Sequence, residues 1–289
     1  MNTTFRAAVS SEWFKLSRRR FCWISIAMTS IVGFVGSVAP KIEEKITSVQ
    51  QQIAGNGAGV AAQNSFVYLS TGLKGVAILA GLFVALAASN AIAGEASGGM
   101  LRISLARPIS RSKYFLAKFV TLIFFLELLF VAGAAAAAGG AALAADFGAA
   151  VKILVKSTFG ELATKTAFAL ALSQLALAAV LGFSLCASTL SKNAAAANSI
   201  TIGFLVLSSL AVLVIESAKS YVFSAYATSP FDTLRAHALG QDAPQPVWFG
   251  IPTLQDWADI TFAWLLPASC AAAFVLIGMR IFSKKDWLA

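Results

Sequence analysis

A segment between two long apolar runs reads NAIAGEASGGMLRISLARPISRSKYFLAK, from Asn90 to Lys118. Two breaks divide it. Gly98 and Gly99 interrupt the helix that the first apolar run predicts, because glycine weakens a helix interior. Pro108 ends any preceding helix at or before Arg107, since the proline ring disfavours the helical conformation of the residue before it. A helix between the two breaks is therefore short.

The short segment between these breaks has one apolar face. Helical spacings of three and four residues place four side chains on that face: Met100, Leu101, Ser104 and Leu105. Basic residues surround it: Arg102, Arg107, Arg111, Lys113 and Lys118. We interpret the segment as a cationic loop that holds a small amphipathic helix, of the kind that seats in a groove of a partner protein. The alternative is an ordinary basic loop between two membrane spans, because inner loops are generally basic.

The composition is that of an integral membrane protein. Of 289 residues, 58% are hydrophobic and 12% are charged, whereas soluble domains carry about 25% charged residues. A spanning helix needs about 20 apolar residues, so we expect an all-α protein with six spans in one transmembrane domain, residues 1–289. The expected spans are 21–39, 75–93, 114–138, 167–185, 199–215 and 261–278. The Ala- and Gly-rich stretch 132–145 predicts close helix packing.

The distribution of charge predicts the orientation. Most of the 22 lysines and arginines fall on the side that holds both termini and the segment 90–118, and most of the 13 acids fall on the other side. Basic loops stay in the cytoplasm, so we expect both termini to be cytoplasmic. The net charge of +9 then reflects topology, and we expect no nucleic-acid partner.

Three segments outside the spans have a pattern of their own. Residues 1–20 place Phe5, Val9, Trp13 and Leu16 on one helical face and charged residues, Glu12 among them, on the other. This predicts either a helix lying on the membrane surface or a plain basic leader before the first span. Residues 40–71 predict an outer helix with one apolar side, and together with the long loop 216–260 they are candidate contacts for an outer-side partner.

The motifs of several enzyme classes are absent from the sequence. No phosphate-binding loop of the form Gly-x-x-x-x-Gly-Lys-Ser/Thr occurs, so this chain is not expected to hydrolyse ATP. The single histidine and the absence of Cys-x-x-Cys give no metal site, and three cysteines give no complete disulfide framework. We assign no catalytic residue and expect no cofactor in this chain.

Glu127 is the one acidic residue near the middle of a predicted span. A carboxylate at this depth costs several kcal/mol, so it faces the protein interior or a wet cavity. It either lines a substrate path or joins helices through a hydrogen bond. Ser173 and Gln174, in the fourth span, are expected to make hydrogen bonds between helices.

A family resemblance rests on eight positions of the segment 90–118: Glu95, Gly98, Leu101, Leu105, Pro108, Ser110, Arg111 and Lys118. They resemble the loop after the second span in permeases of the ABC-2 type of ATP-binding-cassette exporter, although Met100 stands where that family usually has Thr. The resemblance implies that residues 1–20 form an elbow helix and that the loop holds a coupling helix that docks on an ATPase subunit. The coupling residues that it implies are Glu95, Gly98, Gly99, Met100, Leu101, Leu105, Arg107, Pro108 and Arg111.

The resemblance also implies a function and partners. The chain would be the permease subunit of an exporter in the bacterial inner membrane, working as a homodimer or close heterodimer. Separate ATP-binding subunits would hold ATP and Mg and carry out hydrolysis. The main alternative is a secondary transporter or channel without an ATPase, for which an inverted repeat, broken helices or several buried charges are expected. A membrane anchor for another complex is a third interpretation.

Overall fold

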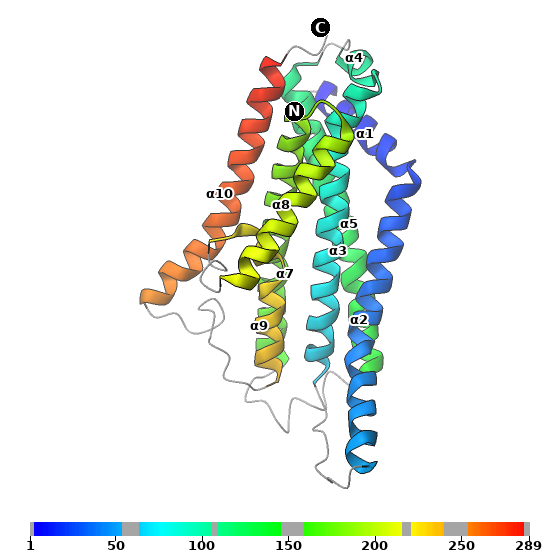
Figure 1. Cartoon of the computed structure of the whole chain (residues 1–289), viewed down its shortest axis with the longest axis vertical. Coiled ribbons are helices and arrows are strands. Elements are labelled where there is room, and N and C mark those ends of the chain that lie inside the picture. Colours follow the sequence, from blue (N-terminus) through cyan, green and yellow to red (C-terminus); the bar gives the residue numbers. More distant parts are fainter. Residues whose placement is uncertain are drawn as a thin grey trace.

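The computed structural model describes residues 3–53, 64–105, 109–145, 159–215, 221–239 and 254–285. Within these residues every regular element is a helix, as the composition predicted (Figure 1). The elements are α1 (Thr3–Ser17), α2 (Arg20–Ile53), α3 (Ser65–Ser97), α4 (Met100–Leu105), α5 (Arg111–Ala144), α7 (Phe159–Leu190), α8 (Ala194–Val214), the 3-10 helix η2 (Phe223–Ala227), α9 (Ser229–Ala238) and α10 (Leu254–Lys284).

Six of the described helices are long and apolar enough to cross a membrane, which confirms the predicted number of spans. They are α2, α3, α5, α7, α8 and α10. Except for α8, with 21 residues, each has between 31 and 34 residues. At a rise of about 1.5 Å per residue, these long helices exceed the hydrocarbon core of about 30 Å. They are therefore longer than the hydrocarbon core requires.

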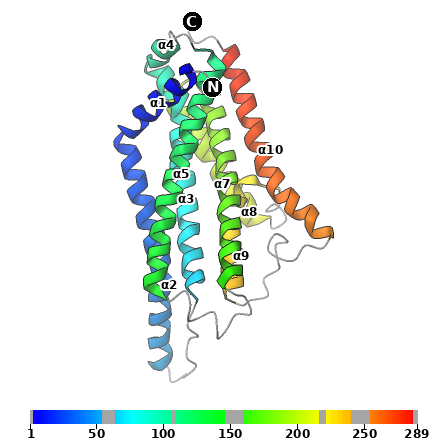
Figure 2. The same cartoon turned by 180° about the vertical axis from the view of Figure 1, so that it is seen from behind.

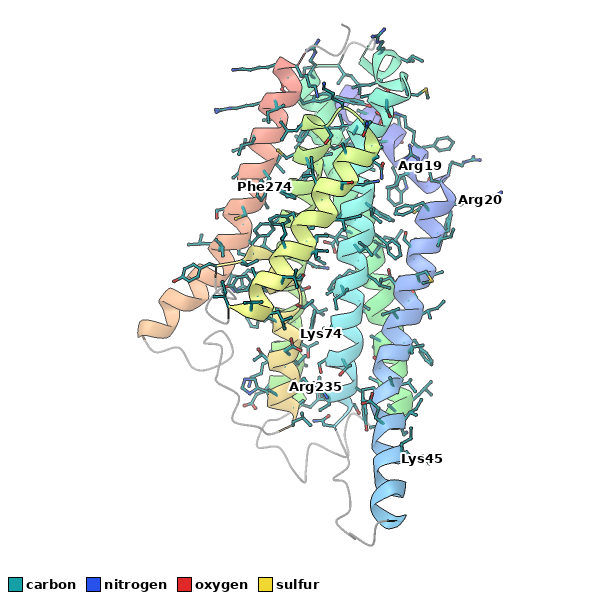
Figure 3. The ribbon with its side chains drawn as sticks, viewed as in Figure 1. Arg19, Arg20, Lys45, Lys74, Arg235 and Phe274 are labelled. Atoms are coloured by element: carbon teal, nitrogen blue, oxygen red, sulfur yellow. The ribbon has the colours of Figure 1, made fainter. Side chains whose placement is uncertain are left out.

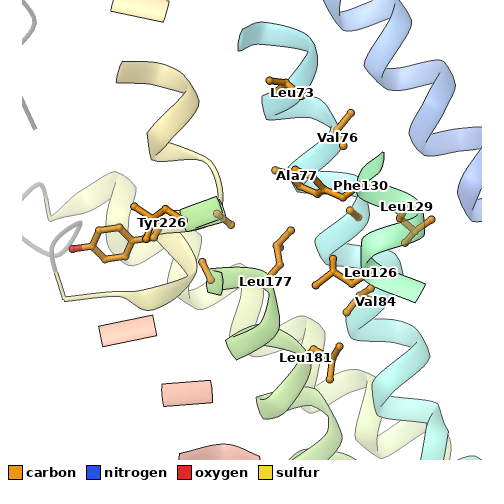
Figure 4. Close-up of a cluster of buried hydrophobic side chains, with 14 of the residues drawn as sticks. Leu73, Val76, Ala77, Val84, Leu126, Leu129, Phe130, Leu177, Leu181 and Tyr226 are labelled. Atoms are coloured by element: carbon orange, nitrogen blue, oxygen red, sulfur yellow. The ribbon is translucent and has the colours of Figure 1, made fainter. Parts of the chain in front are cut away.

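The helix α3 lies at the centre of the bundle and contacts α2, α5, α7, α8 and α9. The helix α8 lies in front in Figure 1, whereas α5 lies in front in the reverse view of Figure 2, so these two helices occupy opposite faces. Buried apolar side chains fill the space between α3, α5, α7 and η2 (Figure 4). The helix α3 is therefore covered on both faces.

Glycines let α2, α3 and α5 approach closely, as the small residues of 132–145 predicted. A Cβ atom on Gly33 of α2 would lie 2.5 Å from the carbonyl oxygen of Gly133 in α5. A Cβ atom on Gly140 of α5 would lie 2.8 Å from the carbonyl oxygen of Phe34 in α2. Small residues favour such backbone contact in lipid, where hydrophobic burial gives little drive to association.

Two predicted loops contain more helix than the sequence indicated. The outer helix expected within 40–71 is a continuation of α2, which runs unbroken to Ile53. In the predicted loop 216–260, η2 and α9 pack against α3 and α7, where Phe231 and Leu234 are buried. An ion pair of 2.6 Å joins Lys74 of α3 to Asp232 of α9. Packing against α3 and α7 buries the apolar side of α9.

One end of the bundle gathers the elements of interest. The helices α1 and α4, the beginning of α5 and the last turns of α10 all lie there (Figures 1 and 2). We call this the α4 end. The first described helix, α1, and the C-terminal end of the last, α10, therefore lie at the same end of the bundle. An even number of spans requires this arrangement.

Candidate functional site

A sharp turn between α3 and α4 creates the tip of the α4 end. Gly98 ends α3, and its N–H bonds the carbonyl oxygen of Gly94 at 3.1 Å. Gly99 follows with φ of 71°, a conformation that glycine adopts without steric cost. The predicted break at Gly98–Gly99 is therefore the point at which the chain leaves α3 and enters α4.

The six residues of α4 divide their apolar side chains between the interior and the surface. Leu101 is 2% exposed, whereas Met100 is 57% and Ile103 is 67% exposed. The docking face predicted from the sequence included Leu101, whose side chain is buried against its own chain. Met100 and Ile103 form the exposed apolar surface of α4. The side chain of Leu105, and residues Arg107 and Pro108, lie outside the described part of the chain.

A buried ion network joins α1, α3 and α5 directly below α4. The Lys118 ammonium of α5 lies 2.7 Å from Glu12 of α1 and 2.8 Å from Glu95 of α3. Lys15 of α1 adds contacts of 2.6 Å to Glu12 and 3.4 Å to Glu95. The Tyr114 hydroxyl donates to Glu95 at 2.7 Å. The four charges balance, which is the condition under which buried charges are tolerated.

The network corrects the predicted placement of Glu12 on the wet face of the first helix. Its side chain is 8% exposed, and that of Lys118 is 4% exposed. Burial opposes the charge on Lys15, but the hydrogen bond to Glu12 and the charges of Glu95 and Glu12 outweigh it and raise the pKa of Lys15 above its usual value. Lys15 therefore stays charged at neutral pH.

Arg111 is turned toward the last helix rather than toward α4. Its Nη1 atom donates to the carbonyl oxygens of Ser283 at 3.3 Å and Lys285 at 2.9 Å. These carbonyls lie at the C-terminus of α10, where backbone oxygens lack partners within the helix. The neighbouring Ser112 hydroxyl lies 3.1 Å from that of Ser283, and the Lys285 ammonium donates to the carbonyl oxygen of Thr189 in α7 at 2.7 Å.

A serine of α7 bonds directly to the backbone of α3 near the same end. The Ser188 hydroxyl accepts from the N–H groups of Ile92 at 3.1 Å and Ala93 at 2.9 Å, and donates to the carbonyl oxygen of Ser89 at 2.6 Å. The Ser89 hydroxyl donates in turn to the Asn198 side chain of α8. Polar contacts thus connect α1, α3, α5, α7, α8 and α10 around the α4 end, and we call this set of contacts the polar collar.

Glu127 lies in α5 away from the polar collar. The Gln174 amide of α7 donates to its Oε2 atom at 2.9 Å, and the Ser173 hydroxyl donates to the carbonyl oxygen of Ala227 at 2.7 Å. Both residues thus make the contacts between elements that the sequence predicted. Glu127 also lines a groove of about 700 Å³ between α1 and α5. The groove walls are mainly apolar and include Phe5, Val9, Trp13, Phe124, Leu128 and Val131.

A second groove, of about 610 Å³, lies between α3, α7, α8 and η2. Apolar side chains of α3 and α8 line it together with the hydroxyl groups of Ser208, Ser209 and Ser224. Glu127 does not line this groove. The helix α8, which supplies much of its lining, lies on the face of the bundle opposite α5 (Figures 1 and 2). Among the described residues no cluster of histidine, cysteine, aspartate and glutamate could hold a metal ion.

Reasoning from the sequence did not identify Glu12, Ile103 and Tyr114 as candidate functional residues. It named Lys118 but did not predict that this lysine belongs to an ion network. One signal was available for Lys118, because it stands inside an apolar run where a lysine needs a partner. The identity of that partner was not available, since Glu12 and Glu95 come from two other helices. Ile103 was missed because the predicted face included Met100 but ran on through Leu101, whereas the exposed apolar side pairs Met100 with Ile103.

Comparison with known proteins assigns nearly the whole chain to a family. No curated protein matches the chain. The family model described as ABC-2 family transporter protein matches residues 7–287. This match spans nearly the full length and includes all six candidate spans. The chain is therefore a multi-pass membrane protein that belongs to the ABC-2 family of transporter proteins.

Proposed function

We propose that the chain is the permease subunit of an ABC exporter and that α4 couples it to a separate ATPase subunit. Family membership implies ATP-binding-cassette partners. The observation that carries the proposal is the exposure of Met100 and Ile103 on a short helix at the tip of the bundle. Two large apolar side chains on a short exposed helix are suited to a groove on a partner. ATP and Mg would then be bound and used by that partner.

The polar collar supports a route for the movement. The turn at Gly99 attaches α4 to the end of α3, where Glu95 is paired with Lys118 of α5. Displacement of α4 would therefore move α3 and α5 together, and it would pull α1 through Glu12. Hydrogen bonds through Arg111 and Ser188 extend the connection to α10 and α7. A collar of this kind favours movement of the α4 end as a unit.

We further propose that the permease functions as a homodimer and that Glu127 lies on the substrate path. The faces of α8 and α10 are the least covered of the spans, which supports contact with a second copy. The groove beside Glu127 opens between α1 and α5 and would give lateral access from the bilayer. On the far side, Ile42 and Ile46 of α2 are exposed, which suits an outer-side contact with a second copy or another protein.

Replacing Ile103 with aspartate is expected to abolish coupling while the permease still folds. The substitution places a charge on the exposed apolar surface of α4, where it opposes docking but disturbs no buried contact. We expect loss of the ATPase subunit on co-purification and loss of transport-dependent ATP hydrolysis. Ile103→Leu is the matched control and should retain both, because it preserves an apolar side chain of the same size.

A second comparison separates docking from folding. Leu101→Asp should reduce the yield of folded permease, because it buries a charge, whereas Ile103→Asp should not. Wild-type recovery of the ATPase with Ile103→Asp, at unchanged transport, would remove α4 from the coupling role and leave a transporter that works without an ATPase as the better interpretation.

We also propose that the α4 end faces the cytoplasm of a bacterial cell, across the inner membrane. Most described lysines and arginines lie near this end, and Arg19 and Arg20 mark the corner between α1 and α2 in Figure 3. Lys74 and Arg235 lie nearer the opposite end (Figure 3). Positive residues remain on the cytoplasmic side during insertion, which supports this orientation.

Cysteine labelling is expected to report this orientation in intact cells. A membrane-impermeant maleimide should react with Gly160→Cys, at the exposed beginning of α7, and should react with Arg102→Cys in α4 only after the membrane is opened. Native Cys22 and Cys186 are buried and should add little background. Labelling of Arg102→Cys in intact cells would reverse the assignment.

A further inference from the structure

We propose that the groove between α1 and α5 binds a lipophilic amine, whose ammonium group pairs with Glu127 while its apolar body lies against the groove walls. Binding itself can be tested without any transport assay. Only the further step, that this amine is the transported substrate, rests on the proposed function.

The negative charge of Glu127, which no described cation balances, points to a cationic ligand. A carboxylate in an apolar setting requires a cation or several hydrogen bonds. Among the described residues, its side chain accepts one hydrogen bond, which the Gln174 amide donates to Oε2. None of the ion pairs among the described residues includes Glu127. Arg6 is the one basic side chain among the described residues that line the groove, and it is exposed on α1.

The walls of the groove point to an apolar body. Phe124 and Val131 of α5 are more than half exposed to the exterior of the bundle, so a molecule dissolved in the bilayer can reach them. Trp13 and Phe124 place aromatic rings in the lining, and aromatic faces attract cations. The volume of about 700 Å³ falls within the usual range of about 300–1,000 Å³ for sites that hold small organic ligands.

Quenching of Trp13 fluorescence tests the proposal. The full-length permease in lipid nanodiscs is titrated with a brominated alkylamine and, separately, with the brominated alcohol of the same chain length. Subtracting the signal of the Trp13→Phe variant isolates quenching within the groove. We expect half-saturation by the amine at a concentration about tenfold lower than by the alcohol, which corresponds to about 1.4 kcal/mol of binding free energy.

Two variants of the groove assign the preference to Glu127. Glu127→Gln keeps the size of the side chain and should bring the two half-saturation concentrations together. Val131→Lys places an ammonium group one helical turn from Glu127 and should abolish the preference, because the protein then supplies its own cation. Val131→Leu is the apolar control for that position and should keep the preference for the amine over the alcohol, even where both half-saturation concentrations change. Glu161→Gln, which removes an exposed acid on α7 outside the groove, is the charge control and should behave as wild type.

Equal quenching by amine and alcohol in the wild type would overturn the proposal and leave the groove as a seat for ordinary acyl chains. Retention of the tenfold preference in Glu127→Gln or Val131→Lys would overturn it as well. If the groove shows no preference for the amine, the proposed coupling role of Ile103 is unaffected. Conversely, selective amine binding together with unaltered coupling in Ile103→Asp would retain the site and refute the proposed function.

Discussion

Replacing Lys118 with methionine is expected to lower the free energy of unfolding by about 3–5 kcal/mol, the usual cost of removing one partner from a buried ion pair. Lys118 lies between Glu12 and Glu95, and its side chain is 4% exposed. Methionine fills similar space but leaves two buried carboxylates with only Lys15 as a cation. Unfolding of the purified permease by a denaturing detergent, followed by circular dichroism, would measure the loss.

The geometry supplies a control and a rescue for this experiment. Lys15→Met removes a cation from the same carboxylates, but the Lys15 side chain is 37% exposed, so the loss should be about 1 kcal/mol or less. The triple variant Lys118→Met, Glu12→Gln, Glu95→Gln removes the stranded charges and should recover much of the stability. Equal effects of Lys118→Met and Lys15→Met would mean that the network is solvated and does not hold α1 to the bundle.

Adjacent glycines of α5 are expected to respond very differently to valine. Gly140→Val should destabilise the permease by about 1–3 kcal/mol or more, the range for overpacking. Its side chain would collide with the backbone of α2, where the carbonyl oxygen of Phe34 lies 2.8 Å from the position of a Cβ atom. Gly139→Val makes the same chemical change one residue earlier, where nothing lies within 4 Å, and should be tolerated.

The detergent-unfolding measurement used for Lys118 distinguishes these two variants, and each controls for the helix propensity of the other. If Gly140→Val proves as stable as Gly139→Val, the backbones of α2 and α5 are not packed closely in the membrane. A loss confined to Gly140→Val would instead assign the stability to this helix contact, since both positions lie in the same Ala- and Gly-rich run of α5.

The number of spans and the position of the turn before α4 could be predicted from the sequence. Each span is a local property, because about 20 consecutive apolar residues must leave water wherever they occur. The break at Gly98–Gly99 is also local, since the turn needs the positive φ that Gly99 adopts. The ends of the helices could not be read from the apolar runs alone. The apolar runs are shorter than the helices, which continue into polar residues once neighbouring helices and caps support them.

The site itself depended on contacts between distant parts of the chain. Periodicity in a six-residue helix cannot show which side rests on its own chain, so Leu101 was expected at the surface and Ile103 was overlooked. Charge patterning likewise cannot show that Glu12, Glu95 and Lys118 meet, because their helices become neighbours only when the bundle packs. By itself the sequence determined the number of spans and the turn that begins α4. Tertiary structure decided which side chains of α4 are exposed and which charges balance one another, since burial and ion pairing are properties of the packed helices.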